Sequence, residues 1–182
     1  MIPLNAPRHG PYRGEPVGDD YCWSMQIDSD SFRAALGRFA TGVTVITSRD
    51  ASGVDQGMTV SAFSSVSLTP PLILICIGHD ASMHTTLSTG THFTVNVLSS
   101  EQEALARRFA DSDAKRFDGV GYTRGLADVA VLDDVLASLE CRRIACHEAG
   151  DHTLIVGAVE GAAVHDAKPL LYYRGGFAAL DR

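Results

Sequence analysis

The sequence predicts a mostly β fold, an antiparallel barrel or sandwich with a few α-helices packed at its openings. Three observations support this fold class. Segments rich in β-branched and aromatic residues dominate the 182-residue chain. These segments do not alternate regularly with helices, as βαβ units would. No G-x-G-x-x-G follows a predicted strand, which excludes a dinucleotide-binding Rossmann fold.

Three helices are predicted from capping residues and apolar spacing, over residues 28–40, within 80–90 and over 100–110. In the first helix, Phe32, Leu36 and Phe39 fall on one face. Gly90 is expected to end the second helix. The expected N-caps are Asp28 or Ser29, Asp80 or Ser82, and Ser100, which would form an S-x-x-E capping box with Glu103.

Six or seven strands are predicted from β-branched content and from alternating apolar and polar positions. Adjacent prolines at 70 and 71 interrupt the chain between two of them. Residues 111–130 are rich in Gly and Asp and are predicted to be a loop. The strands are expected over residues 42–48, 57–69, 72–77, 92–99, 136–150, 151–164 and 169–177.

The composition excludes several classes of protein. The formal net charge of −7 argues against a nucleic-acid partner, because phosphate backbones are bound by clustered Lys and Arg. The longest strongly apolar run, 71–77, is far too short to span a bilayer. The first twenty residues lack the apolar run of a signal peptide. We therefore expect a cytoplasmic protein with no membrane contact, whose four cysteines are reduced thiols.

One folded domain is expected, preceded by an arm. Four of the seven prolines lie in the first eighteen residues, so residues 1–24 are predicted to be poorly ordered or extended. Residues 25–182 then form the domain. Within it, Cys141 and Cys146 are separated by a C-x4-C spacing, which places them on opposite faces of a strand. No metal site is therefore expected.

The stretch GMTVSAFSSVSLT, residues 57–69, carries six hydroxyl side chains among apolar residues and no charge. Such a strand can face a flat ligand like flavin, whose ring faces are apolar and whose edge carries carbonyl and N–H groups. Hydroxyls satisfy that edge without adding charge. The alternative is an ordinary half-exposed strand, where Ser and Thr are common. The hydroxyl residues are Thr59, Ser61, Ser64, Ser65, Ser67 and Thr69.

A second candidate is the segment GHDASMHTTL, residues 78–87. The free N–H groups and the dipole of a helix N-terminus bind phosphate, and neighbouring hydroxyl and imidazole groups would add donors. An ordinary capped helix is the alternative explanation. The side chains concerned are Ser82, Thr85, Thr86 and either His79 or His84.

Two further segments lie near strand ends. His152 follows a turn glycine, Gly150, and an imidazole there can donate a hydrogen bond or transfer a proton near neutral pH. Tyr172, Tyr173 and Arg174 could line a pocket, stack on a ring or contact a phosphate. Equally, each of these residues could simply lie exposed on the surface.

Taken together, five segments resemble the flavin reductase-like family, the reductase components of two-component flavin-dependent monooxygenases. They are FRAALGRFATGVTVITS, GMTVSAFSSVSLTPPLILICI, FTVNVLS, GDHTLIVGAVE and PLLYYRGGF, in the order and spacing of that family. The resemblance covers residues 28–178. It implies a split β-barrel that binds FMN, usually as a homodimer with the flavin near the subunit interface.

The resemblance also implies roles for particular residues. The segment matching Thr59–Ser65 runs beside the flavin ring, and the segment matching His79–Thr86 lies near the ribityl phosphate. Gly150–His152 is associated with the nicotinamide nucleotide, with His152 as the catalytic residue, and Tyr172–Arg174 lies close to the same cleft. The implied cofactor-binding residues are Thr59, Val60, Ser61, Ala62, Ser64, Ser65, His79, Ser82, Thr85, Thr86, Gly150, Asp151, His152, Tyr172 and Arg174.

The implied function is that of an NAD(P)H:flavin oxidoreductase. Such an enzyme reduces FMN, or FAD, by hydride transfer and supplies free reduced flavin to a separate monooxygenase. No basic cluster for a 2′-phosphate is evident, which favours NADH over NADPH. Two alternatives remain open: an enzyme that retains its FMN and acts on another substrate, and a non-enzymatic flavin-binding protein.

Overall fold

The structure, a computed structural model, describes residues 27–111 and 115–180, so the predicted arm at 1–24 lies outside the described residues. Strands dominate it, and the few helices are short, as predicted. In chain order the elements are α1 (Ser29–Leu36), β1 (Thr41–Gly42), β2 (Thr44–Arg49), β3 (Asp55–Val60), β4 (Phe63–Leu68), β5 (Pro71–Gly78), α2 (His84–Thr89), β6 (His92–Val97), η1 (Ser100–Gln102), α3 (Glu103–Ala110), β7 (Tyr122–Arg124), η2 (Leu126–Asp128), β8 (Ala130–Leu132), β9 (Ala137–Ala149), β10 (His152–Val164), β11 (Leu170–Tyr173) and β12 (Gly176–Ala179).

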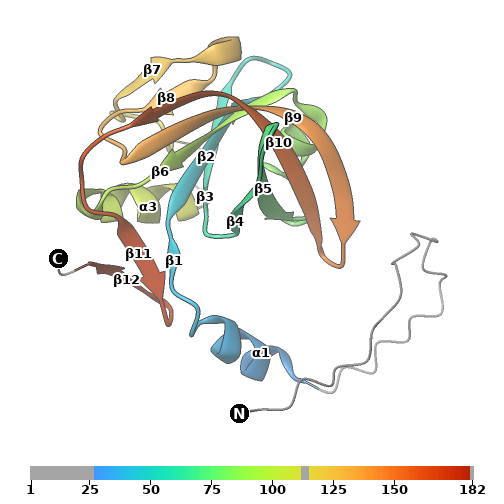
Figure 1. Cartoon of the computed structure of the whole chain (residues 1–182), viewed down its shortest axis with the longest axis vertical. Coiled ribbons are helices and arrows are strands. Elements are labelled where there is room, and N and C mark those ends of the chain that lie inside the picture. The colour runs from blue at the N-terminus through green and yellow to red at the C-terminus, as the bar shows by residue number, and fades with distance from the viewer. Residues whose placement is uncertain (1–26, 112–114, 181–182) are drawn as a thin grey trace.

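A seven-stranded antiparallel sheet forms the barrel, in the order β3-β2-β6-β9-β10-β5-β4 (Figure 1). Its two edge strands, β3 and β4, are consecutive in the sequence and are joined by Ser61 and Ala62. This short link brings the edges together, and β3 approaches β5. Within the described residues the two edges do not pair with each other, so the barrel is split along this line. The predicted split β-barrel is confirmed.

The prediction of one strand over residues 57–69 was wrong, because the chain turns at the split. At the turn, the Phe63 N–H donates to the Ser61 carbonyl (3.0 Å) and the Cys76 N–H donates to the Ala62 carbonyl (3.0 Å). Both halves have the composition of strands, so the pattern does not reveal the turn. The hydroxyl-rich stretch therefore supplies both edges of the split.

The prediction of one strand over residues 169–177 was also wrong. Arg174 and Gly175 adopt positive φ angles of 52° and 82°, which makes a tight turn between β11 and β12. This hairpin joins β1 in a separate three-stranded sheet. The Arg174 N–H donates to the Gly37 carbonyl (2.9 Å), which ties the turn to the end of α1.

The helix starts differ in part from the predictions. Asp28 caps α1 as predicted, accepting from the N–H groups of residues 30 and 31. The capping box before α3 is formed by Ser99 and Gln102, one residue upstream of the predicted pair. α2 begins at His84 with no side-chain cap, so neither Asp80 nor Ser82 has the predicted capping role. Gly90 ends α2 as predicted. The predicted loop at 111–130 contains β7 and η2.

The barrel core is aliphatic and closely packed. Ile46, Ile75, Val95 and Ile155 are fully buried at its centre. Phe93 on β6 lies against Gly157 on β10, where the β9–β10 ladder shifts register. A Cβ on Gly157 would lie 2.7 Å from Cζ of Phe93, so only glycine fits there without displacement.

Replacing Gly157 with valine is expected to destabilise the fold by about 1–3 kcal/mol, because the new side chain overpacks the core against Phe93. The free energy of unfolding, measured by urea denaturation, checks this. Gly42→Ala is the matched control, since a Cβ on Gly42 meets no atom within 4 Å. Equal stability of Gly157→Val and the wild type would show that the contact is not tight.

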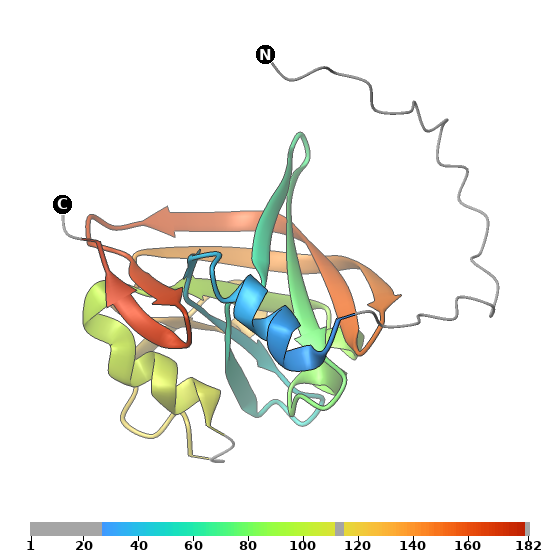
Figure 2. The ribbon, with the colours of Figure 1, turned by 90° about the horizontal axis from the view of Figure 1, so that it is seen from below.

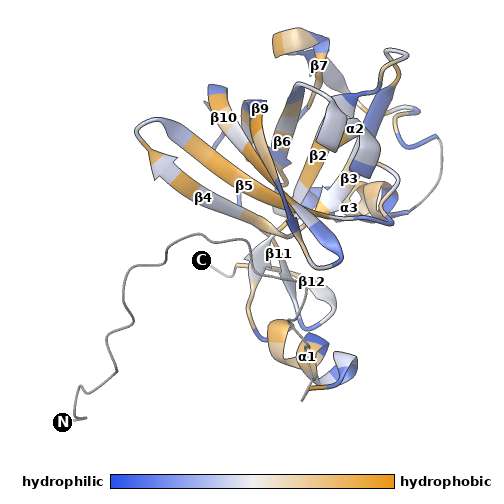
Figure 3. Ribbon diagram, turned by 90° about the vertical axis from the view of Figure 1, so that its right-hand side faces the viewer, coloured by the Kyte–Doolittle hydropathy of each residue, from blue (hydrophilic) through white to orange (hydrophobic). Residues whose placement is uncertain are grey.

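Two apolar surfaces remain uncovered. α1 buries none of its residues, and Figure 3 shows it standing apart from the barrel with hydrophobic residues on it. Phe32, Leu36 and Phe39 are 51%, 57% and 77% exposed. The β4–β5 hairpin projects from the barrel (Figure 2), and Leu68 near its tip is 94% exposed. No helix of the described part of the chain is long and apolar enough to cross a membrane.

Candidate functional site

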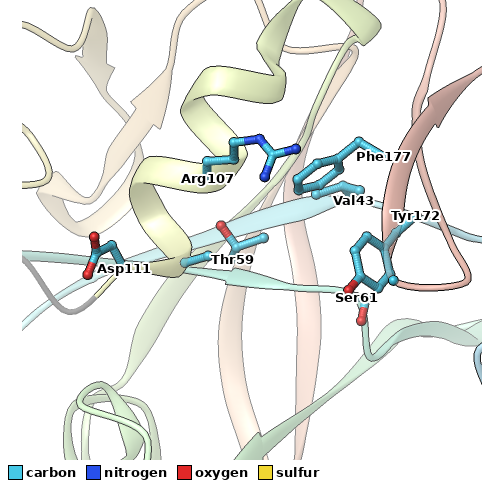
Figure 4. A pocket seen from close by; sticks show the side chains of 9 residues that line it. Val43, Thr59, Ser61, Arg107, Asp111, Tyr172 and Phe177 are labelled. Carbon is cyan, nitrogen blue, oxygen red and sulfur yellow. The ribbon is translucent and has the colours of Figure 1, made fainter. Parts of the chain in front are cut away.

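Two adjoining cavities open beside the split of the barrel. The first, of about 550 Å³, lies between β3, α3 and the β11–β12 hairpin (Figure 4). The second, of about 790 Å³, lies between α1, the Ser61–Ala62 link and β5. Both are lined by Ser61, Tyr172 and Gly175. Flat ligands in the two cavities would therefore meet at Ser61 and Tyr172.

Four of the six residues of the hydroxyl-rich stretch that were predicted to bind the cofactor line these cavities, and Ser61 lines both. Thr59 lines the first cavity, and Ala62 and Ser64 line the second. The Thr59 hydroxyl donates to the Ala106 carbonyl of α3 (2.7 Å), which holds α3 against β3. The other two of these predicted residues lie elsewhere: Val60 is buried in the barrel core, and Ser65 is exposed on β4 and lines neither cavity. The hydroxyl residues Ser67 and Thr69 also line neither cavity.

Tyr172 and Arg174, from the β11–β12 hairpin, also reach the cavities. Tyr172 lines both, and Arg174 lines the second. The Tyr172 ring packs edge-on against Phe177, with ring centroids 5.5 Å apart, and Arg107 lies 4.9 Å from the centre of the Phe177 ring. These contacts connect α3 to the hairpin across the first cavity (Figure 4).

His152 lies on the sheet face that forms the wall of the second cavity. Opposite residues in an antiparallel pair point to the same face, and alternate residues share it. Leu74 and Cys76 line the cavity, and Gly78 follows in the same row on β5. His152 lies opposite Gly78, so it stands at the end of this row, two residue pairs beyond the pair of Cys76 and Leu154, and it lines neither cavity itself.

Asp151 orients His152. Nδ1 of His152 lies 2.7 Å from Oδ1 of Asp151, and this hydrogen bond is the main cause that lowers the pKa of Asp151. The carboxylate therefore stays ionised over the neutral range and leaves Nε2 for a ligand. Nε2 lies beside Gly78, where a Cβ would come within 3.7 Å of it. Gly150, with φ of 66°, makes the turn that precedes this pair.

The side chains that were predicted to bind a phosphate do not lie together in the structure. His79 contacts Glu148, with 2.8 Å between Nε2 and Oε2. Ser82 and Thr85 are exposed at the start of α2. Thr86 lines a separate cavity of about 430 Å³ with Arg49 and His92. Of the four predicted side chains, Ser82 is therefore the one that the structure connects to β3.

Arg116 makes this connection, and it was not among the residues predicted from the sequence. Its Nη1 donates to the Gly57 carbonyl of edge strand β3 (2.5 Å), and its Nη2 lies 3.5 Å from Oγ of Ser82. The cation thus lies between the helix start and the hydroxyl-rich strand. Arg116 is 59 residues from Gly57 in sequence, so no local pattern signals the contact.

The donor set fits a flavin with its phosphate. Among the described side chains, Thr41 Oγ1 and Arg116 Nε are buried without a hydrogen-bond partner. Thr41 lines the second cavity, where its hydroxyl can meet the polar edge of a ring. Arg116 offers a guanidinium to a phosphate. A ring edge needs uncharged hydroxyls and a phosphate needs a cation, and the structure places both beside the split.

Within the described residues, no group of three or more His, Cys, Asp and Glu side chains is placed to hold a metal ion. Cys76, Cys141 and Cys146 are free thiols. Burial is the main cause that raises the pKa of Cys141 to about 12, and burial also raises the pKa of Cys76. Only the thiolate reacts with alkylating reagents.

We expect native alkylation at pH 8 to leave Cys141 unmodified, because a pKa of about 12 leaves roughly one thiol in ten thousand ionised there. Labelling should rise steeply as the pH approaches that value or when urea exposes the thiol. Peptide mass spectrometry after iodoacetamide treatment measures it. Rapid modification of Cys141 in the folded protein at pH 8 would contradict the burial described here.

Comparison with known proteins shows to which family the chain belongs. The family model described as "Flavin reductase like domain" matches residues 36–181. The chain belongs to the flavin reductase-like family. The match includes every strand of the barrel and the residues that line both cavities from β1 onward.

Relatives of this flavin reductase-like protein carry specific names. It is 45% identical over 155 residues to an FMN reductase (NADH) of Agrobacterium fabrum, covering 85% of this chain and 88% of the relative. It is 34% identical to the reductase subunit of a flavin-dependent monooxygenase of Rhodococcus jostii, covering 92% and 86%. Among solved structures, an NADH:FAD oxidoreductase of Streptomyces globisporus in complex with NAD and FAD fragments is 39% identical, with a TM-score of 0.79 over 83% of this chain and 92% of that one.

Proposed function

We propose that the protein is an NADH-dependent flavin reductase that reduces FMN, or FAD, and releases the reduced flavin to a separate monooxygenase. The observation that carries the proposal is the pair of cavities that meet at Ser61 and Tyr172, with His152 in the same row of side chains as Cys76. Two adjoining sites suit two flat rings held against each other. The names of the relatives support the same activity.

The hydroxyl-rich edges of the split hold the flavin ring. Ser61, Ser64 and Thr41 present hydroxyls, and the link at Ser61–Ala62 presents backbone groups to the polar edge of the ring. Arg116 and Ser82 hold the phosphate. Thr41 and Ser64 lie on strands, Ser61 lies in the short link between β3 and β4, and Arg116 is tied to β3 through the Gly57 carbonyl, so the strands set the positions of these groups.

His152 orients the nicotinamide. The hydrogen bond between Asp151 and Nδ1 fixes the orientation of the imidazole, and this sets the direction in which Nε2 points. Bound flavin accepts a hydride from NADH and carries it away in the reduced ring. The protein's own contribution is therefore position and polarity, since hydride transfer requires the two rings to be held close together. Tyr172, which lines both cavities, packs against the rings.

A second copy of this chain is the proposed partner for the uncovered apolar surfaces. Phe32, Leu36 and Phe39 on and after α1 are more than half exposed, and they border the second cavity through Leu36 and Phe39. Burying them in a homodimer would complete that cavity and remove an apolar patch from water. Sedimentation equilibrium should give twice the mass of the 182-residue chain.

We place the protein in the cytoplasm. Cys76, Cys141 and Cys146 are free thiols, as expected in a reducing compartment. Both proposed substrates are soluble nucleotides.

The proposal is tested by NADH oxidation with flavin-stripped protein, with and without added FMN. A rate that rises and saturates with FMN is expected, because flavin then comes and goes as a substrate. Turnover of another substrate by protein that never loses its FMN would favour a flavin-retaining enzyme. FMN binding without nicotinamide oxidation would instead leave a flavin-binding protein.

A further inference from the structure

Four side chains form a closed ring of contacts at the end of the β9–β10 hairpin. Glu148 contacts His79 (Oε2 to Nε2, 2.8 Å) and accepts from the Thr153 hydroxyl (Oε1 to Oγ1, 3.2 Å). The Thr153 hydroxyl also lies 2.8 Å from Nε2 of His84. The rings of His84 and His79 then meet edge-on, with centroids 5.1 Å apart. We call these four residues the hairpin clasp.

The contacts fix the tautomer of His84. A threonine hydroxyl has one hydrogen, and here it is donated to Glu148. The same oxygen must therefore accept from His84, so Nε2 of His84 carries a proton. Thr153 is 1% exposed, which keeps water from replacing either bond. The clasp thus has a defined direction of hydrogen bonding that begins at His84 and ends at the Glu148 carboxylate.

The clasp encloses the turn that carries His152. Thr153 directly follows His152 in the chain, and Glu148 lies opposite Thr153 in the β9–β10 ladder. His79 directly follows Gly78, which lies opposite His152. The His79 N–H also donates to the Asp151 carbonyl (3.0 Å). Three elements, β5, α2 and the hairpin, are therefore held to one another within a residue of His152.

We propose that Glu148 is a positioning residue for NADH, acting through His152. Hairpin ends are among the more mobile parts of a fold, and small displacements of a positioning group reduce rates strongly. Glu148 joins the two histidine-bearing segments, β5–α2, to the hairpin, so its removal frees the turn. The proposal rests on the function proposed above. It also gives His79 a role in the clasp in place of the phosphate contact expected from the sequence.

If Glu148 only stabilised the fold, its loss would lower the melting temperature and weaken FMN and NAD⁺ binding equally. The Glu148 side chain is 73% exposed, and exposed ion pairs contribute little to stability. Loss of Glu148 should then leave the melting temperature and the flavin site almost unchanged. A selective loss in the use of NADH would therefore report position and not folding.

The test compares Glu148→Ala with Glu148→Gln and with Glu160→Gln. Glutamine keeps an acceptor for Thr153 but loses the charge that His79 contacts. Glu160 is the matched control, because it lies on β10 and pairs with Arg142 on β9 and with His92 on β6, away from the turn. The readouts are the KM for NADH, the dissociation constants of NAD⁺ and FMN, the melting temperature, and the ¹⁵N NMR signal of Nε2 of His84.

We expect Glu148→Ala to raise the KM for NADH and the dissociation constant of NAD⁺ about five- to tenfold, with FMN binding within about twofold of the wild type. For Glu148→Gln, both constants should lie between those of the wild type and those of Glu148→Ala. For Glu160→Gln, both should equal those of the wild type. In Glu148→Ala alone, the ¹⁵N signal should show that Nε2 of His84 no longer carries the proton. An unchanged NAD⁺ dissociation constant in Glu148→Ala, or an equal loss of FMN and NAD⁺ binding, overturns the proposal.

A double-mutant cycle with His152→Ala separates this proposal from the function on which it rests. If Glu148 acts through His152, adding Glu148→Ala to His152→Ala should cause almost no further loss. Additive losses contradict positioning through His152. If His152→Ala itself keeps full NADH use, the role proposed for His152 fails, whatever Glu148→Ala shows.

Discussion

Replacing His152 with alanine is expected to lower kcat/KM for NADH about a hundredfold and to leave the FMN dissociation constant nearly unchanged. His152 lies opposite Gly78, in the same row of side chains as Cys76 of the second cavity, while the hydroxyls and Arg116 that are proposed to hold the flavin lie on other elements. Steady-state oxidation of NADH and fluorescence titration with FMN measure the two effects separately.

His147→Ala is the matched control for this prediction. His147 is an exposed histidine on the same hairpin, opposite Leu154 in the β9–β10 ladder. The His147→Ala variant should oxidise NADH at the wild-type rate. Wild-type kcat/KM in His152→Ala, or a parallel loss of FMN binding, would show that His152 does not serve the nicotinamide.

Replacing Ser61 with leucine is expected to lower kcat/KM about a hundredfold as well, but through both substrates. Ser61 lines both cavities at the place where they meet, so a branched apolar side chain there separates the two rings and removes a hydroxyl from the flavin edge. Ser61 is exposed in the link between β3 and β4, so the melting temperature should stay within a few degrees of the wild type.

Ser52→Leu serves as the control, since Ser52 is exposed in the β2–β3 turn and lines neither cavity. FMN and NAD⁺ titrations of both variants provide the measurement. If Ser61→Leu binds both nucleotides like the wild type, the junction of the cavities is not where the substrates meet.

The fold class followed from the sequence because strand composition and helix caps are local. The resemblance to the family implied a split barrel, but the position of the split in the chain was not predicted. Residues 57–69 have the pattern of one long strand, and the turn at Ser61–Ala62 arises because β3 and β4 belong to opposite edges of a curled sheet. The same holds for Arg174 and Gly175, where a positive φ divides a segment that alternates like a strand.

The candidate site was predicted best where it lies on contiguous residues. Thr59, Ser61, Ala62, Ser64, Tyr172 and Arg174 all line the cavities. Thr41 and Arg116 were missed, because each reaches the site through contacts between distant segments. His79 contacts Glu148 and not the expected phosphate site. The two residues lie close together because of the strand register, which the sequence around residue 79 does not reveal.

We propose that this chain holds flavin and NADH together and then releases the reduced flavin. The direct test mixes the protein anaerobically with a tenfold molar excess of FMN over protein, and with NADH in excess over the FMN. The loss of the visible flavin absorbance is then followed with time. We expect all of the FMN to be bleached over several turnovers, because reduced flavin leaves and oxidised flavin replaces it. Bleaching that stops at one flavin per chain, or does not occur, would contradict it.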